Sequence, residues 1–365
     1  MSQGIPCVRY GELYTLHRYF IREFGSFVGE HVARSATPIR RGDLLIATSG
    51  ETKADIGPTA VVDSDEQAVA GGDLVIFRTT EADPTFLAYL LNSHDLQTQK
   101  AKVAKGDAVV HIYTADLRDL LVNLPELTEQ RAIASALSDA SAWVESLDAL
   151  IAKKRSTRIA VCQSLLANWS DWTSVSLSEV TSRASGCWGH DQLFDGASLC
   201  NVIRAGDITP SGKLVSIAQR YLSPTELSKS EVLKNDIVIT ASGNGLGKTW
   251  LSDGRADMAA SNFVRRLRAD GARVIPAFIA HVLLSDVGRR QLDSHTATSA
   301  YPNLMPSFFE EEWLRLPSLD EQRAIAGVLT EMDCEIDALV AQRDKAELIR
   351  QGMAQDILSG KVRLV

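Results

Sequence analysis

The chain of 365 residues is 45% hydrophobic and 23% charged, a balance typical of a globular protein with room for more than one core. Its net charge of −8 argues against binding nucleic acid by bulk electrostatics alone, because Lys and Arg must neutralise the phosphates. Its apolar runs are shorter than the ~18–20 residues of a membrane span, and residues 1–13 lack a secretory pattern. We therefore expect a cytoplasmic protein without membrane contact.

The globular parts of the chain predict a mixed α/β (α+β) fold. Short β-like runs are bounded by Gly, Asp and Ser, and two apolar stretches have the length of short helices. No regular βαβ pattern of a parallel nucleotide-binding fold is present. In chain order, the strands are expected at 43–48, 74–78, 236–240 and 262–267, and the short helices at 85–92 and 277–284.

Two long helices are predicted, from Thr128 to Asn168 and from Asp320 to Gly360. Apolar residues recur there at alternating steps of three and four, which is the seam of a coiled coil. Each helix would span roughly 60 Å at 1.5 Å per residue. Because a lone apolar stripe must be buried and each helix offers a matching one, we expect the two helices to pack against each other.

The second half of the chain repeats the first. LPELTEQRAIASAL at 124–137 returns as LPSLDEQRAIAGVL at 316–329, a shift of 192 residues. This period is far longer than the ~20–50 residues of a solenoid repeat, so it predicts two domain-sized units. Residues 172–199 have no counterpart in the first copy. We therefore expect the first unit to be incomplete at its N-terminus, with an exposed sheet edge near Val8–Leu13.

These patterns divide the chain into four predicted segments. They are a first globular domain (1–123), a first spacer helix (124–168), a second globular domain (169–315), and a second spacer helix with the C-terminal tail (316–365).

The loop from Ser242 to Thr249 ends in Gly-Lys-Thr and is close to a phosphate-binding P-loop. However, Ser242 stands where the motif requires its first glycine, and no helix pattern follows. The equivalent loop of the first copy, Ser49–Lys53, has no such ending. Nucleotide binding remains an alternative. It would be supported if the chain bound ATP and Lys248→Ala abolished that binding.

Catalytic and metal-binding patterns are absent from the sequence. The five cysteines show no CxxC spacing, the seven histidines are dispersed, and no nucleophile elbow or methyltransferase motif is found. We therefore expect a non-catalytic chain without a metal. Basic clusters at Arg265–Arg268 and at Lys100, Lys102 and Lys105 offer local positive faces, although such clusters are commonly just solvated surface.

Two variable units, each followed by a PxLxEQRAIAxxL motif and a long helix, and the ending LSGKVRLV at 358–365, together resemble the specificity subunit of a type I restriction-modification system. Residues 172–180 resemble the usual opening of a target recognition domain in that family. The resemblance implies that each globular domain recognises one half of a bipartite, asymmetric double-stranded DNA target, while the two antiparallel coiled-coil helices set the spacing.

The resemblance also implies partners. The helices would dock two methyltransferase subunits, which bind S-adenosylmethionine, and motor-nuclease subunits that use ATP and Mg²⁺ would join them in phage defence. These cofactors belong to the partners, and none is expected in this chain. Two alternatives remain: a cassette-type or partly crippled subunit that recognises one half-site, and the specificity component of a type II system with a fused methylase-nuclease.

Base recognition needs polar and basic side chains on loops that can enter a groove. The candidates are Ser49, Glu51, Thr52, Lys53, Lys102, Lys105 and His111 in the first copy, and Ser242, Asn244, Lys248, Thr249, Thr298, Ser299, Tyr301 and Asn303 in the second. For partner docking, the candidates at the helix starts are Glu129, Gln130, Arg131, Glu321, Gln322 and Arg323.

Overall fold

The computed structural model describes residues 4–167, 171–243, 245–297 and 301–364, and the chain divides into two compact units. Unit 1 consists of Met1–Ala149 and Val340–Val365, and unit 2 of Leu150–Leu339. Helices α6 (Leu127–Leu165) and α12 (Leu319–Leu358) each contribute one part to each unit. The two predicted long helices are therefore confirmed. Among the described residues, no helix is both long and apolar enough to cross a membrane.

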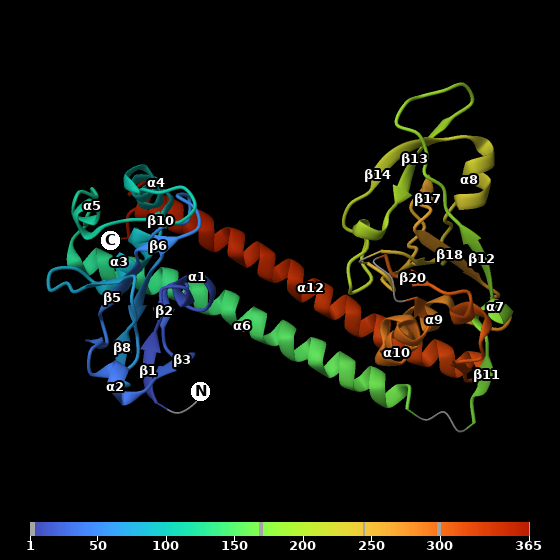
Figure 1. Cartoon of the computed structure of the whole chain (residues 1–365), viewed down its shortest axis with the longest axis horizontal. Coiled ribbons are helices and arrows are strands. Elements are labelled where there is room, and N and C mark those ends of the chain that lie inside the picture. The colour runs from blue at the N-terminus through green and yellow to red at the C-terminus, as the bar shows by residue number, and fades with distance from the viewer. Residues whose placement is uncertain (1–3, 168–170, 244, 298–300, 365) are drawn as a thin grey trace. The chain divides into compact units, whose positions relative to one another are not determined.

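Unit 1 contains two four-stranded sheets and a set of short helices (Figure 1). The first sheet has the order β3-β1-β8-β4 and the second the order β2-β7-β5-β9. Residues such as Val8, Ile21 and Leu45 fill the core between them. The strands are β1 (Ile5–Val8), β2 (Phe20–Ile21), β3 (Ser26–Val28), β4 (Thr37–Ile39), β5 (Leu44–Ala47), β7 (Thr59–Val62), β8 (Ala68–Ala70) and β9 (Leu74–Phe77), with a separate pair β6 (Ser49–Gly50) and β10 (Val110–His111).

A second core of unit 1 joins its second sheet to the long helices. Helix α3 (Pro84–Leu91) starts at a proline, and Asp83 caps it by accepting a hydrogen bond from the Phe86 N–H at 2.9 Å. Six of the eight α3 residues are buried, packing with Ile133 and Leu137 of α6 and with Ile357 of α12. The other helices of unit 1 are α1 (Glu12–Thr15), α2 (Glu30–Ala33), α4 (His94–Val103) and α5 (Thr114–Arg118).

The prediction of an exposed sheet edge near Val8–Leu13 is wrong. Strand β1 is central, because it pairs with β3 on one side and with β8 on the other, and Val8 is completely buried. Leu13 is buried in helix α1. The second sheet ends instead at β9, which pairs only with β5 among the described residues. The sequence could not locate this edge, because strand order depends on contacts between distant segments.

Unit 2 repeats this plan with a four-stranded sheet β12-β18-β15-β16 and a three-stranded sheet β14-β13-β17. These strands are β12 (Thr181–Ser185), β13 (Ser198–Ile203), β14 (Ala218–Leu222), β15 (Ile237–Thr240), β16 (Thr249–Leu251), β17 (Met258–Ala260) and β18 (Val264–Ala269). Two further pairs are β11 (Thr173–Val175) with β21 (Leu314–Leu316), and β19 (Thr296–Ala297) with β20 (Asn303–Leu304). The helices are α7 (Leu177–Val180), α8 (Pro224–Ser230), α9 (Pro276–Leu284), α10 (Asp286–Ser294), α11 (Ser307–Glu310) and the 3₁₀ turn η1 (Ala205–Asp207).

The duplication seen in the sequence extends to individual interactions. In unit 1, Arg78 binds the buried carboxylate of Asp43 at 2.8 Å, and in unit 2 Arg268 binds the buried Asp236 at 2.7 Å. Both pairs lock a strand to its neighbour, β9 to β5 and β18 to β15. A buried carboxylate needs such a partner, so we expect either arginine to be important for the stability of its own unit.

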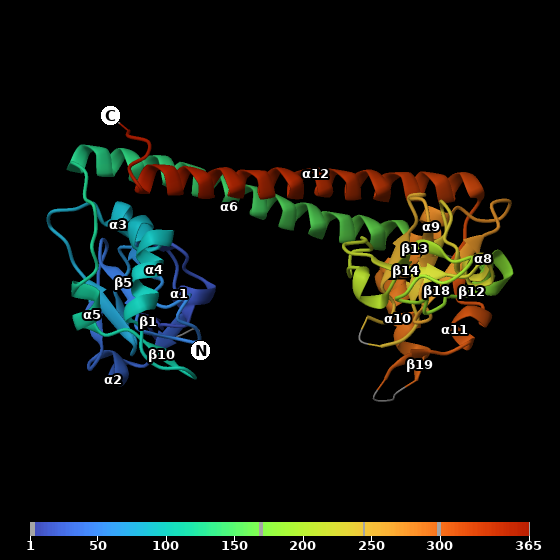
Figure 2. The same cartoon turned by 90° about the horizontal axis from the view of Figure 1, so that it is seen from above.

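Within each unit, α6 and α12 run antiparallel and are joined by ion pairs. In unit 1, Arg363 donates to Glu129 at 2.6 Å and Arg343 to Asp148 at 2.9 Å. In unit 2, Arg158 pairs with Asp333 at 2.8 Å and Lys154 with Glu335 at 2.6 Å. Apolar residues of the predicted seam, including Leu147, Ile151 and Ile336, are buried. The predicted packing of the two helices is thus confirmed (Figure 2).

One buried cation departs from this regular pattern. Lys100 of α4 is only 1% exposed, and its ammonium donates to the Gly57 carbonyl at 2.5 Å. No carboxylate pairs with it among the described residues, and burial lowers its pKa to about 7. The position 192 residues further on, which also packs against the equivalent glycine, is the buried Leu292. Unit 1 therefore holds a lysine where unit 2 holds an ordinary core residue.

We expect Lys100→Met to stabilise unit 1 by about 1–3 kcal/mol at pH 7, because it removes a poorly solvated polar group. The unfolded chain keeps an ordinary lysine pKa near 10.5. Between about pH 7 and 10.5 it therefore binds more protons than the folded chain, and wild-type stability rises with pH in that window. Urea denaturation at pH 6.5 and 9.5 checks this. The stability difference between the two proteins should shrink at the higher pH, and a difference independent of pH would contradict the assignment.

Candidate nucleic-acid interface

In unit 1 the two predicted recognition loops lie side by side. Strand β6 pairs with β10, so that Ser49 faces His111, and the Ser49 hydroxyl lies 2.9 Å from His111 Nδ1. A turn brings Lys105 back to His111 through two backbone hydrogen bonds of 2.9 and 2.8 Å. Residues from separate parts of the sequence thus form one loop platform, which we call platform 1 (residues 48–58 and 104–113).

Unit 2 has an equivalent arrangement, platform 2 (residues 241–249 and 295–305, except those outside the described ranges). Ser242 bridges to Asn303, and the Gly243 N–H donates to the Pro302 carbonyl at 2.9 Å. The Leu304 N–H donates to Ala241 at 2.9 Å. The two loops proposed from the second copy are therefore held together by backbone hydrogen bonds, as they are in the first.

The predicted site residues fall into three groups. Some are at the surface of the platforms or beside them, namely Glu51, Thr52, Lys53, Lys102, Lys105, Tyr301 and Asn303, with His111, Ser242 and Lys248 half-buried. Ser49 and Thr249 are buried, and the Thr249 hydroxyl donates to the Gly247 carbonyl at 3.1 Å, so neither is presented to a ligand. Asn244, Thr298 and Ser299 lie outside the described residues.

The loop that resembles a P-loop does not have the geometry of one. Thr249 begins strand β16 and no helix starts there, so no set of helical N–H groups faces a phosphate. The glycines instead permit a tight turn: Gly247 has a φ of +81°, and an added Cβ would lie 2.6 Å from the Leu292 side chain.

Aromatic side chains surround platform 1. Tyr10, Tyr14 and Tyr113 are each more than a third exposed. The Tyr14 hydroxyl donates to the Ser49 carbonyl at 3.0 Å, and burial raises the pKa of Tyr14 to about 12, so it stays a protonated donor. The ammonium of Lys105 lies 5.3 Å from the Tyr113 ring centre and 3.2 Å from Asp116. Exposed rings beside a lysine are a surface on which bases and sugars can pack.

Unit 2 has an aromatic pair that the sequence analysis missed. Trp188, 65% exposed, meets Phe263 edge to face with ring centres 5.0 Å apart. The Ala241 N–H donates to the Phe263 carbonyl at 2.9 Å, which joins this pair to platform 2. The only sequence signal was an isolated Trp in a segment rich in Gly and Ser. Its partner Phe263 lies 75 residues further along the sequence. The two segments approach closely at Gly186, where an added Cβ would lie 2.1 Å from the Ser261 carbonyl oxygen.

Beside this pair, Arg265 of β18 is the most distinctive charge of unit 2. Its guanidinium donates to the Asn262 and Val264 carbonyls at 2.8 and 3.2 Å. Unlike Arg268, it has no carboxylate partner in the described part of the chain. Burial lowers its pKa, and the charge of Arg183 acts in the same direction. A half-buried guanidinium with free donors is suited to a phosphate or to the O6 and N7 of guanine.

Polar atoms without partners surround Arg265. Within the described residues, the Asn262 side-chain oxygen and the Ser261 hydroxyl are buried and make no hydrogen bond. Buried polar atoms are normally satisfied, so these two atoms are exceptions in this part of the fold. Arg183, on the adjacent strand β12, stacks over the Phe309 ring at 4.6 Å and also lacks an ion pair there.

The predicted docking residues at the helix starts have different surroundings. Gln130 and Gln322 are buried and bind their own unit: Gln130 accepts from the Asp83 N–H at 2.9 Å, and Gln322 from the Ile275 N–H at 2.9 Å. Their amide groups donate to the Pro125 and Pro317 carbonyls at 2.8 and 3.0 Å. Glu129 is also occupied, by Arg363, whereas Arg131, Glu321 and Arg323 are exposed. Only these last three present free surface for a partner.

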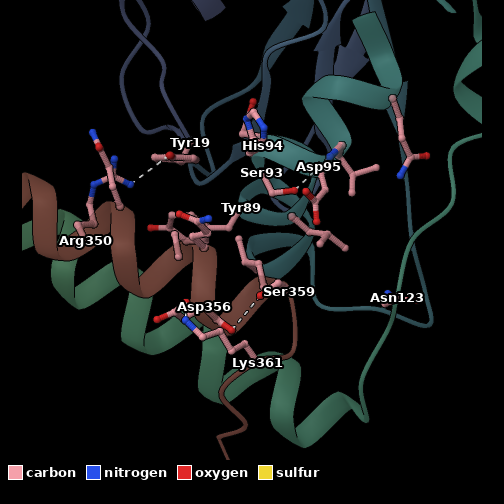
Figure 3. A pocket seen from close by; sticks show the side chains of 18 of the residues that line it. Tyr19, Tyr89, Ser93, His94, Asp95, Asn123, Arg350, Asp356, Ser359 and Lys361 are labelled. Atoms are coloured by element: carbon pink, nitrogen blue, oxygen red, sulfur yellow. Dashed lines mark hydrogen bonds and ion pairs between the residues drawn. The ribbon is translucent and has the colours of Figure 1, made fainter. Parts of the chain in front are cut away.

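A groove of about 720 Å³ in unit 1 runs between α3, α4 and the end of α12 (Figure 3). Its charged residues are largely paired: Arg350 donates to Glu347 at 2.8 Å and to the Tyr19 hydroxyl at 3.1 Å, and Lys361 binds Asp356 at 2.7 Å. The Arg350 guanidinium holds the pKa of Glu347 to about 2. Among the described residues, no group of three His, Cys, Asp or Glu side chains could hold a metal ion. The groove has the character of a packing surface.

Comparison with known proteins identifies relatives over nearly the whole chain. The model of the type I restriction modification DNA specificity domain matches residues 18–153 and 170–348. The chain is 20% identical over 364 residues to the type I restriction enzyme StySPI specificity subunit of Salmonella potsdam, covering 92% of this chain and 77% of that protein. It is 23% identical over 289 residues to the EcoBI specificity subunit of Escherichia coli, covering 70% of this chain and 60% of that one.

Solved structures show the same fold. The S subunit of the type I restriction-modification system from M. genitalium superposes with a TM-score of 0.60 at 16% identity, over 97% of this chain and 89% of that one. A chain from a structure concerned with complex assembly of the type I restriction-modification system gives a TM-score of 0.57 at 19% identity, over 98% and 92% of the two chains.

The buried glutamines give a testable distinction between folding and docking. We expect Gln322→Ala to lower the free energy of unfolding by about 1–3 kcal/mol, because it leaves buried backbone groups without partners. The matched control is Arg323→Ala, one residue further on and exposed, which should leave stability unchanged within about 0.5 kcal/mol. Urea denaturation followed by circular dichroism checks both. Unchanged stability of the Gln322 variant would mean that the side chain serves a partner instead of the fold.

Proposed function

The chain belongs to the family of type I restriction-modification DNA specificity domains, and we propose that units 1 and 2 each recognise one half of a bipartite DNA target through platforms 1 and 2. It is a non-catalytic DNA specificity subunit that works with other subunits of a restriction-modification system. The observation that carries the two-site proposal is the duplication: each unit presents a paired-loop platform at the same place in its fold.

The chemistry of the two platforms supports recognition of different half-sites. Platform 1 offers Lys105, Tyr113 and His111, whereas platform 2 adjoins Trp188, Phe263 and Arg265. Arg265 pairs with Ile239 in unit 2, and Val75 pairs with Ile46 in unit 1. Because Ile239 and Ile46 occupy the same position in the repeated strands, Val75 is the unit 1 equivalent of Arg265. Since the side chains at the platforms differ, the two half-sites are expected to differ, and the target is then asymmetric.

The long helices are the second part of the proposal. We propose that they set the distance between the two half-sites and dock two methyltransferase subunits, with Arg131, Glu321 and Arg323 among the exposed docking residues. S-adenosylmethionine would then be bound by the methyltransferases, and ATP and Mg²⁺ by motor-nuclease subunits that join the assembly. The complex would act in the cytoplasm, where the cellular DNA lies, as a defence against phage.

The first experiment tests recognition by unit 2. The chain is co-expressed with its methyltransferase subunit in a host without adenine methylation, and methylated adenines are mapped across the genome. We expect a two-part motif. Arg265→Ala should relax one position of one half only, because loss of a bidentate contact removes about 1–3 kcal/mol of discrimination. Arg255→Ala, at the opposite end of the β15–β16 sheet and paired with Asp253, is the matched control and should leave the motif unchanged.

The outcomes separate the alternatives. A motif with a single defined half would support a subunit that recognises only one half-site, and methylation without sequence preference would contradict the proposal. An unchanged motif in the Arg265 variant would remove this residue from base recognition but not the function of the chain.

The spacing role of the helices is tested by length. We expect insertion of seven residues after Ala149 in α6 together with seven after Leu339 in α12 to leave both half-sites intact and to widen their separation. Seven helical residues add about 10 Å, which corresponds to about three base pairs at 3.4 Å each. The heptad seam is preserved by this insertion. Methylation mapping of the double insertion measures the new spacing, and a motif with unaltered spacing would show that the helices do not set it.

A further inference from the structure

Platform 1 contains an exposed loop whose inner end is anchored in unit 1. Residues 51–55 of this loop are exposed, whereas Ile56 and Gly57 are buried. Ile56 is completely buried and packs with Val110 and Ile112 of the other half of the platform. The loop therefore has an outer part that faces solvent and an inner part that is held by the fold.

Side chains of helix α4 hold this inner part by hydrogen bonds. The Gln97 amide Nε2 donates to the Ala54 and Ile56 carbonyls, both at 2.8 Å. The Lys100 ammonium, three residues further along the helix, donates to the Gly57 carbonyl at 2.5 Å. Residues three apart lie on the same face of a helix, so α4 holds the backbone of residues 54–57 from one side.

The equivalent loop of unit 2 is shorter and is closed by its own backbone. Three residues separate Gly243 from Gly247, whereas six separate Gly50 from Gly57. The Leu246 N–H donates to the Gly243 carbonyl at 3.0 Å, within the loop itself. Because the entropic cost of closing a loop grows with its length, the longer loop of unit 1 gains more from contacts that come from outside it.

The two side chains that hold the loop belong to unit 1 alone. At the shift of 192 residues, Gln97 corresponds to Arg289 and Lys100 to Leu292. Arg289 is exposed, and Leu292 is a buried apolar side chain that packs against Gly247. The repeated fold therefore forms with a leucine at the position of Lys100, and the lysine is not required by the fold at this place.

Lys100 is also not required to satisfy the carbonyl that it binds. The Thr59 hydroxyl donates to the same Gly57 carbonyl at 3.2 Å, as the Thr249 hydroxyl donates to Gly247 in unit 2 at 3.1 Å. The lysine is enclosed by the residues around it, since only 1% of it is exposed. A buried amine without a carboxylate lowers stability. What the lysine adds is a short, directional hydrogen bond that fixes the loop backbone more closely than an apolar contact does.

We propose that Lys100 and Gln97 are positioning residues, which fix loop 51–57 so that its exposed side chains recognise one half-site of the DNA target. This inference rests on the recognition of DNA by platform 1. Lys100 and Gln97 act from beneath the loop, and the contacts with bases come from its exposed polar residues. A binding side chain must be held within about 0.5 Å of its working position, so a loosened loop loses discrimination between bases.

The test uses the chain in complex with its methyltransferase subunit, with the wild-type methylation motif as the reference. Lys100→Met keeps the apolar stem and removes the amine, and Gln97→Leu removes the amide. We expect each variant to lower base preference about 10-fold at one or more positions of the same half-site. The other half-site and the spacing should not change. The matched control is Thr98→Ala on the exposed side of α4, where the hydroxyl donates to the His94 carbonyl, and it should leave the motif unchanged.

Two measurements on the full chain separate positioning from folding. In urea denaturation, the Lys100→Met variant should be at least as stable as the wild type, because it loses a buried amine. In amide hydrogen exchange, residues 51–57 should exchange at least ~5-fold faster in both variants. The amides of 44–47 and 59–62, in the neighbouring strands β5 and β7, should not exchange faster. A structural role alone would not combine retained stability with a loosened loop.

The outcomes are distinct. Relaxation of the same half-site by Lys100→Met and Gln97→Leu, with stability retained in the Lys100 variant, supports the inference. An unchanged two-part motif in both variants overturns it, as does relaxation that comes with lower stability of the Lys100 variant. It is also overturned if the relaxed half-site is the one that Arg265→Ala relaxes, since that half-site belongs to unit 2. A wild-type complex that methylates without sequence preference overturns the proposed function itself, and this inference with it.

Discussion

The side chains of Gln130 and Gln322 join each long helix to the globular part in which it starts. Each amide accepts from the N–H just before or at the start of a short helix and donates to the proline carbonyl that precedes the long helix. Both side chains are buried, so these hydrogen bonds form in a low dielectric and cannot be exchanged for water at little cost. Together with the apolar packing of Ile133 and Leu137 in unit 1 and of Ile325 and Leu329 in unit 2, these hydrogen bonds hold the start of each long helix on its own globular part.

This constraint explains how the repeated and the variable residues divide their tasks. The repeated positions stabilise the same backbone arrangement in the two units. They are the buried glutamines, the Arg78–Asp43 and Arg268–Asp236 ion pairs, and the glycine turns. The residues that differ include those at the platforms or beside them, such as Arg265 against Val75. A fixed frame with exchangeable loops lets one fold present two unlike surfaces, because loop side chains can change without repacking the core.

The sequence predicted the regular parts of this fold and the approximate place of the platforms. Long helices follow from apolar periodicity, and the glycine-rich loop from local turn chemistry, and both are properties of neighbouring residues. The open edge at β9, the aromatic pair of Trp188 with Phe263, and the burial of Thr249 are set by segments 20 or more residues apart. Strand order and side-chain burial cannot be derived from local pattern, which is why the edge was predicted at Val8–Leu13 instead.

A chain with a net negative charge can still recognise DNA if some of its basic side chains are not neutralised by carboxylates of the same fold. Many arginines are neutralised within the fold, such as Arg78, Arg268 and Arg350 by nearby carboxylates. Arg265 and Arg183, on the adjacent strands β18 and β12, carry no ion pair in the described residues, and Arg265 pairs with Ile239 just before platform 2. A net charge of −8 weakens attraction to phosphates over the rest of the surface. Non-specific binding then falls more than specific binding, so the ratio between the two, which decides target selection in a genome, increases.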